Sequence, residues 1–216
     1  MQALSTGSRS VTEPALLLTA TLAALIWSGI APFDLVTWVL EVFPVLIAIP
    51  ALVLTYRRHP LSPLLYRLIC LHALILIFGG HYSYARVPLG FWMQDLLDFS
   101  RNNYDRIGHL AQGFVPAILA REILLRNHVV RRGPWLSVLV VSVCLAFSAL
   151  YELLEWLAAL VSADAAESFL GTQGDVWDTQ WDMFMALCGA LSAVLLLPGA
   201  HDRSMRASRI DGGAPR

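Results

Sequence analysis

The chain has 216 residues with a net charge of −1, of which 57% are hydrophobic and only 14% charged, and its mean hydropathy is +0.61. A soluble domain usually carries about 25% charged residues, so this composition excludes an ordinary soluble protein, and the near-neutral charge does not favour nucleic acid as a partner. The length fits one domain with room for about six or seven membrane crossings of roughly 20 residues each.

The chain begins with a polar segment, residues 1–13, which precedes the first apolar run. That run has no small-residue cleavage site at its end, where Trp27, Pro32 and Asp34 follow, so we expect a retained helix and not a signal peptide. In chain order, six segments predict membrane-spanning helices: residues 14–31, 34–56, 63–84, 104–125, 134–161 and 179–197. We therefore predict an all-α fold, a polytopic transmembrane helical bundle of about six spans that forms one domain over residues 14–198.

Two features lie outside or between these spans. Residues 85–103 are amphipathic enough to lie on the membrane surface, and residues 199–216 are expected to form a disordered cytoplasmic tail. Within the sixth span, small residues recur on one face and predict close packing against another helix; they are Ala186, Gly189, Ala190 and Ala193.

Arginine is distributed unevenly among the connections. All 15 basic residues are arginines. Twelve of them precede the first span, flank the second and fourth connections, or follow the sixth span, whereas Arg86, Arg101 and Arg106 lie on the other side. Because cytoplasmic connections are enriched in basic residues, we predict that both termini face the cytoplasm.

Ionisable side chains inside spans are costly and mark functional candidates. In the predicted orientation, ten polar residues lie near the outer face: Glu41, His81, Asp105, His109, Gln112, Glu152, Glu155, Asp175, Asp178 and Asp182. The pairs 105/109, 152/155 and 178/182 are three or four residues apart, so each pair shares one face of its helix. Three helices are therefore expected to aim polar pairs at one point.

Clustered carboxylates repel one another and are costly to desolvate, so we expect a positive charge among them. One candidate is a divalent metal ion, held by Asp105, His109, Glu152, Asp178 and Asp182. Arg106 or shared protons are the alternatives. Oxygen and nitrogen donors without thiolate suit Mg, Ca, Mn, Fe or Zn and do not select one of them.

Simpler structural roles compete with this interpretation. Asp105 also suits the start of a helix, His109 an interhelical hydrogen bond, and Glu155 the membrane interface beside Trp156. Glu122 is expected to form a surface ion pair with the neighbouring arginines at the inner face.

Five segments form a motif set that is specific in combination: NNYDRIGHLAQGFVPAILAREILLR (102–126), YELLEW (151–156), GTQGDVWDTQWDM (171–183), EVFPVLI (41–47) and FGGHYSYARVPLGFW (78–92). This set resembles the YjdF-like family of bacterial inner-membrane proteins. The resemblance covers residues 34–197 and implies a multi-pass protein of the bacterial inner membrane. It implies no reaction, because the family has no established biochemical activity.

A looser similarity is to VanZ-like membrane proteins, which carry Asp-x-x-x-His at the start of one span, followed by a glutamate and an aspartate in the next two. Here that pattern falls on Asp105, His109, Glu152 or Glu155, and Asp182. VanZ-like proteins are associated with glycopeptide resistance, so this similarity implies chemistry at the cell envelope.

Three classes of function remain. We rank first a membrane-embedded, enzyme-like metal site at the outer leaflet, acting on a lipid or lipid-linked substrate that enters from the bilayer. A structural or accessory protein, whose polar residues only join the helices, comes second. An ion-coupled carrier comes third, because the charges gather at one face and no inverted repeat is evident. The sequence predicts no oligomeric state.

Overall fold

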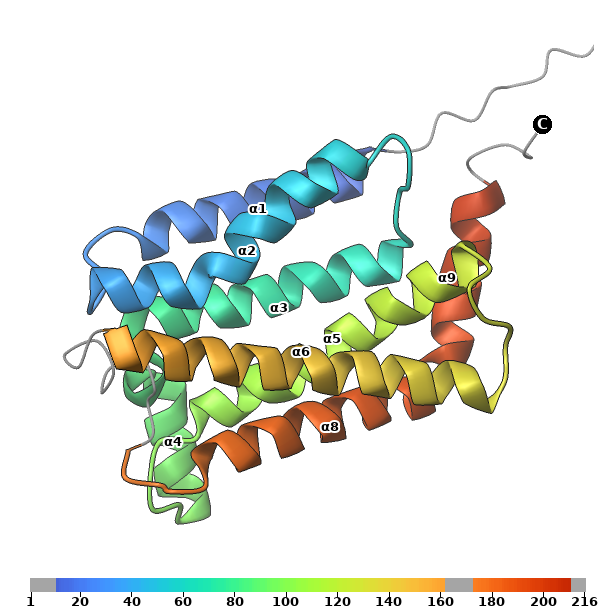
Figure 1. The fold of residues 1–216 in the computed structure, drawn as a ribbon. Helices are drawn as coiled ribbons and strands as arrows, with labels where there is room; N and C mark the ends of the chain where they lie inside the picture. The colour runs from blue at the N-terminus through green and yellow to red at the C-terminus, as the bar shows by residue number, and fades with distance from the viewer. Residues whose placement is uncertain (1–10, 162–172, 211–216) are drawn as a thin grey trace, which may run out of the picture.

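The computed structural model describes residues 11–161 and 173–210. Within these residues the ordered elements are all helices, and no strand is present: α1 (Thr12–Ser28), α2 (Leu35–Thr55), α3 (Pro63–Tyr82), the 3-10 helix η1 (Tyr84–Arg86), α4 (Pro88–Leu97), α5 (Tyr104–Arg126), α6 (Pro134–Val161), α8 (Asp178–Leu196) and α9 (Pro198–Ile210). Six long helices, α1, α2, α3, α5, α6 and α8, run side by side as a bundle (Figure 1). The short helix α4 lies at one end of the bundle, and α9 crosses the opposite end (Figure 1).

The predicted helical membrane bundle is confirmed. Four helices, α2, α3, α6 and α8, are long and apolar enough to cross a membrane, and α1 is a shorter apolar helix. Many large apolar side chains point outward, among them Leu54 and Leu195, which are 79% and 76% exposed. An apolar exterior of this kind suits a lipid environment.

Local sequence signals explain several helix starts. The Asp34 side chain accepts a hydrogen bond from the Thr37 amide at 2.7 Å and caps α2. This bond and its neighbours lower the pKa of Asp34 below its ordinary value. Proline occupies the first position of α3 and of α4, where a missing N–H costs nothing. The predicted starts of α3 and α5, at Pro63 and Tyr104, are both confirmed.

The pairing of α5 with α8 depends on glycine. A Cβ atom added to Gly113 of α5 would overlap the backbone of Ala186, and one added to Gly189 of α8 would overlap the backbone at Leu110. The small-residue face predicted on the sixth span is buried along its length. Because the two backbones approach so closely, polar residues near the starts of α5 and α8 are held at short range.

The expected disordered tail is wrong for residues 199–210, which belong to α9. The segment folds as a helix because one of its faces is buried against the bundle, through His201, Met205 and Ser208. The low hydrophobicity of α9 gave no indication of this packing, because the main contacts of the helix are polar. Residues 211–216 lie outside the described part of the chain.

Candidate functional site

Helices α5 and α8 begin at one end of the bundle, where α6 approaches its end (Figure 1). Polar side chains of these three helices meet there. His109, on the second turn of α5, is their centre and is buried. Its Nε2 atom lies 3.3 Å from Asp105 Oδ1 and 3.9 Å from Asp182 Oδ1, and its Nδ1 atom lies 3.8 Å from Glu152 Oε1. Both ring nitrogens therefore face carboxylates.

Two overlapping groups in this cluster have the spacing that metal ligands need. One consists of Asp105, His109 and Asp182, and the other of His109, Glu152 and Glu155. In each group, one donor atom per residue lies within 4.8 Å of the others. We call these five residues the His109 cluster. They are Asp105 and His109 of α5, Glu152 and Glu155 of α6, and Asp182 of α8.

Several buried atoms of this region have no hydrogen-bond partner among the described residues. They are His109 Nδ1, Gln112 Oε1, Glu152 Oε1 and Asp182 Oδ1. A buried polar atom without a partner costs about 1–3 kcal/mol. A site with several such atoms close together suits a ligand that binds all of them. Carboxylate and amide oxygens and an imidazole nitrogen can each coordinate a metal ion.

Two of the expected site residues are instead neutralised by arginines. Asp178 forms a buried ion pair with Arg101. Asp175 forms one with Arg106 at 3.1 Å, and the Arg106 guanidinium also lies over the Trp181 ring, 4.9 Å from its centroid. Asp178 was expected among the metal ligands, but it belongs to neither metal-capable group of the described residues.

Sequence reasoning missed Arg101, which sits in the loop before α5 and is 77 residues from its partner. The same loop is fixed by Asn102, whose side chain accepts from the Tyr104 amide at 3.1 Å and donates to the Val87 carbonyl at 3.0 Å. Gln173 completes the anchor, since it exchanges two hydrogen bonds with the Asn102 backbone. The loop therefore holds Arg101 beside the start of α8.

The two candidates from α2 and α3 behave differently. Glu41 is buried on α2, close enough to Asp105 and His109 to interact with their charges. His81, in contrast, faces α1: its Nδ1 atom lies 2.9 Å from the Ser28 carbonyl, and its ring packs on Trp27 with centroids 4.5 Å apart. The structure therefore brings Glu41 towards the His109 cluster and leaves His81 outside it.

A second polar cluster lies at the other end of α5. It contains the expected ion pair between Glu122 and Arg126, but the carboxylate of this pair is not at the surface. The Glu122 side chain is fully buried. It accepts from the Ser62 amide at 2.9 Å and from the Ser62 hydroxyl at 2.6 Å, pairs with Arg126 at 2.8 Å, and lies 2.9 Å from His201 Nε2. Its main partners come from α9 and from the segment before α3, far away in sequence, so local spacing did not predict them.

The hydrogen bonds of this second cluster assign its histidine. Arg121 lies 2.8 Å from His201 Nδ1. An arginine only donates, so Nδ1 is the acceptor and Nε2 carries the proton that is donated to Glu122. Arg121 and Arg132 also pair with Asp202. Burial alone would raise the pKa of Asp202, but these two arginines outweigh it and lower the pKa below the ordinary value. We call Glu122, His201, Arg121, Arg126 and Asp202 the His201 cluster.

Comparison with known proteins gives one family. Residues 13–203 match a family model described as a predicted membrane protein, DUF2238. The chain is 55% identical over 189 residues, which are 88% of this chain and 90% of the relative, to the inner membrane protein YjdF of Escherichia coli strain K12. No solved structure matches.

Proposed function

This chain belongs to the DUF2238 family of predicted membrane proteins and is a multi-pass protein of the inner membrane, and we propose that its His109 cluster binds a divalent cation and acts on a lipid or lipid-linked substrate of the cell envelope. One observation carries this proposal. Both nitrogens of a buried histidine face carboxylate oxygens, and several of these atoms have no hydrogen-bond partner among the described residues.

The distances favour a cation on the Nε2 side of the ring. Metal–ligand distances of roughly 2.0–2.6 Å place neighbouring ligand atoms about 3–4 Å apart. The separations of Nε2 from Asp105 and Asp182, 3.3 Å and 3.9 Å, match this spacing. A ligating histidine usually donates its other ring N–H to a carboxylate, and Glu152, 3.8 Å from Nδ1, has the position for that role.

The position of the cluster supports a substrate from the outer leaflet. Of the three arginines at this end of the bundle, Arg101 and Arg106 pair with aspartates and Arg86 stacks over a phenylalanine ring at 4.1 Å. The other arginines of the described residues lie towards the opposite end, which is the distribution expected when the His109 cluster faces the periplasm. Helix α4, at the same end, exposes Phe91 and Trp92 and suits contact with lipid.

The chemistry would be that of a Lewis acid. A cation held there would supply Lewis acidity, which polarises a phosphoryl or carbonyl oxygen and activates water. A carboxylate of the cluster would take the proton from a water that adds to the phosphorus or carbon atom, and would return that proton to the departing ester oxygen. Glu155, which belongs to one metal-capable group with His109, would relay the proton. Gln112, three residues after His109 on α5, would orient the substrate.

Metal analysis of the purified protein tests the proposal. The wild type should bind about one Mn²⁺ or Zn²⁺ ion per chain, whereas His109→Ala and Asp182→Asn should bind none. His81→Ala is the matched control, since this histidine lies at the same end of the bundle but faces α1. A wild type that binds no ion, or a control that loses binding equally, would contradict the proposal.

A further inference from the structure

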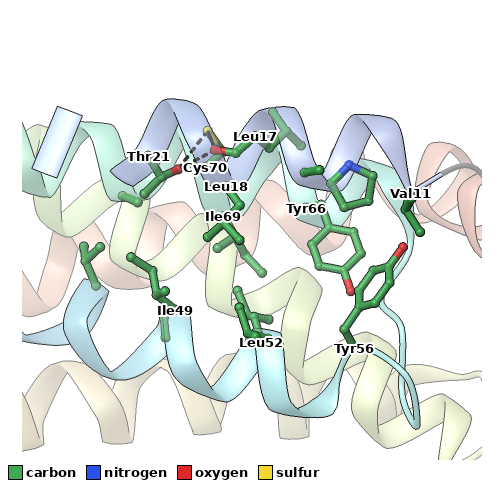
Figure 2. A pocket seen from close by; sticks show the side chains of 16 residues that line it. Val11, Leu17, Leu18, Thr21, Ile49, Leu52, Tyr56, Tyr66, Ile69 and Cys70 are labelled. Atoms are coloured by element: carbon green, nitrogen blue, oxygen red, sulfur yellow. Dashed lines mark hydrogen bonds between the residues drawn. The ribbon is translucent and has the colours of Figure 1, made fainter. Parts of the chain in front are cut away.

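A cavity of about 260 Å³ lies between α1, α2 and α3, and none of the His109 cluster residues lines it (Figure 2). Helices α1 and α2 each pack against α3, which forms the floor of the space between them. The lining extends from Val11, which directly precedes α1, to Thr21, and from Val45 to Tyr56, which directly follows α2. At 1.5 Å per residue these stretches are roughly 15 Å long, about half the thickness of a bilayer's hydrocarbon core. The cavity is therefore one leaflet deep.

The wall of the cavity is apolar. Figure 2 shows Leu18, Ile49, Leu52 and Ile69 facing the same space. The polar atoms towards the deep end are already bonded, because the Thr21 hydroxyl lies 2.9 Å from the Leu17 carbonyl and 3.4 Å from the thiol of Cys70 (Figure 2). A wall of this kind suits an alkyl chain and leaves no partner for a polar solute.

The other end of the cavity has the character of a membrane interface. Tyr56 and Tyr66 lie there together, with ring centroids 6.0 Å apart (Figure 2), and tyrosine is enriched at headgroup depth. Arg57 and Arg58 follow directly, and both are exposed. Neither forms an ion pair with another described residue, whereas Arg67, on α3, pairs with Glu13. The mouth therefore carries unbalanced positive charge, which attracts anionic lipid.

We propose that this cavity holds one acyl chain of an anionic glycerophospholipid, whose phosphate lies at Arg57 and Arg58. Three properties agree on this occupant: the depth of one leaflet, the aliphatic wall and the basic mouth beside two tyrosines. The lipid fills the space between α1 and α2 and fastens both helices to α3. This inference does not depend on the metal site, because the cavity is lined by other residues and opens towards the opposite end of the bundle.

Photo-crosslinking in vesicles tests the inference. The full chain is reconstituted in phosphatidylethanolamine with a trace of phosphatidylglycerol that carries a diazirine on one acyl chain, and adducts are mapped by mass spectrometry. We expect adducts on cavity residues of α1, α2 and α3, about tenfold more abundant than with the same chain on phosphatidylcholine. Adducts spread evenly over the lipid-facing surface, or equal labelling by both lipids, would overturn the proposal.

Two variants separate the chain from the headgroup. Ala48→Trp fills the cavity and should abolish the cavity adducts. Ile47→Trp, at the preceding position, which is 53% exposed and does not line the cavity, should keep them. Arg57→Gln combined with Arg58→Gln should leave the adducts in place and remove the preference for phosphatidylglycerol. An unchanged preference in that double variant would contradict the headgroup assignment.

Should Ala48→Trp fail to fold, competition in the wild type decides. Excess unlabelled phosphatidylglycerol must then suppress the cavity adducts, and excess phosphatidylcholine must not. Suppression by both lipids alike would show a site for any acyl chain and would overturn the anionic specificity.

Discussion

The His201 cluster and the His109 cluster each bury a histidine among carboxylates, at opposite ends of α5 and roughly 20 Å apart along that helix. In the His201 cluster, Glu122 bonds to Ser62, Arg126 and His201, and a further arginine donates to the other nitrogen of the histidine. In the His109 cluster, the histidine and two carboxylates keep buried atoms without a hydrogen-bond partner among the described residues.

The difference between them is the supply of cations. The carboxylates of the His201 cluster face three arginines, Arg121, Arg126 and Arg132. The metal-capable groups around His109 contain four carboxylates, and the arginines nearby are taken by Asp175 and Asp178. Buried carboxylates and histidine thus hold helices together where arginines neutralise the carboxylate charge. Where arginines are lacking, the same residue types suit the binding of a positively charged ligand.

The largest effect should come from breaking the His201 cluster. Glu122→Ala leaves the partly exposed Arg126, the buried His201 and the Ser62 donors without their acceptor. We expect a loss of about 3–5 kcal/mol in the free energy of unfolding. Thermal unfolding of the detergent-solubilised protein measures this. His109→Ala, in the absence of divalent cations, should be much milder, since it removes a group that lacks its full set of partners. Equal losses in the two variants would erase the distinction between the clusters.

The next effect concerns Asp178, the carboxylate at the His109 end that does have a buried arginine. Arg101→Gln should behave like a break in the His201 cluster and cost about 3 kcal/mol, because it leaves a buried charge unbalanced. Arg101→Gln combined with Asp178→Asn should recover most of this loss, as a double-mutant cycle would report. If the single and double variants unfold at the same temperature, the ion pair between Arg101 and Asp178 does not stabilise the protein.

A divalent cation should stabilise only one of the two regions. At about one hundred times its dissociation constant, the ion should raise the free energy of unfolding by about 2.7 kcal/mol. His109→Ala and Asp182→Asn should abolish the gain, and His81→Ala should retain it. The readout is the shift of the unfolding temperature with added metal and its reversal by a chelator. A shift that survives His109→Ala would place the ion elsewhere.

The smallest effect is the pH dependence of the His201 cluster. The pKa of Asp202 is lowered in the folded protein, so its contribution is fully present above the unfolded value, about 3.9, and is lost as the pH falls through the lower folded pKa. We expect less than about 1 kcal/mol, since Arg132 is more than half exposed. Asp202→Asn should flatten the fall in unfolding temperature below pH 4, whereas Asn at the exposed Asp95 should leave it unchanged.

Hydropathy and residue spacing predicted what depends on local sequence. The long helices of the bundle, the start of α5 and the small-residue face of α8 follow from runs and repeats within one segment. The depth of each polar residue along its helix follows in the same way. The rotation of a helix about its axis does not, which is why His81 was expected near the cluster but turns towards α1.

Polar contacts between residues far apart in the sequence could not be predicted either, because they depend on how the helices pack. Arg101 and Asp178 are 77 residues apart, and Glu122 and His201 are 79 residues apart. Each partner alone has a common residue type with no distinctive neighbours, so only packing shows that the two belong together. The contact between Glu122 and His201 holds α9 against the bundle, and hydropathy did not predict this contact.

The distance between Glu122 and His201 also sets an order on biogenesis. The ribosome makes Glu122 79 residues before the histidine that bonds to it. Until α9 emerges, the end of the bundle that holds Glu122 keeps a carboxylate whose permanent partners are incomplete. A chain that stops before His201 never acquires this partner, so its Glu122 stays without one of the groups that balance it.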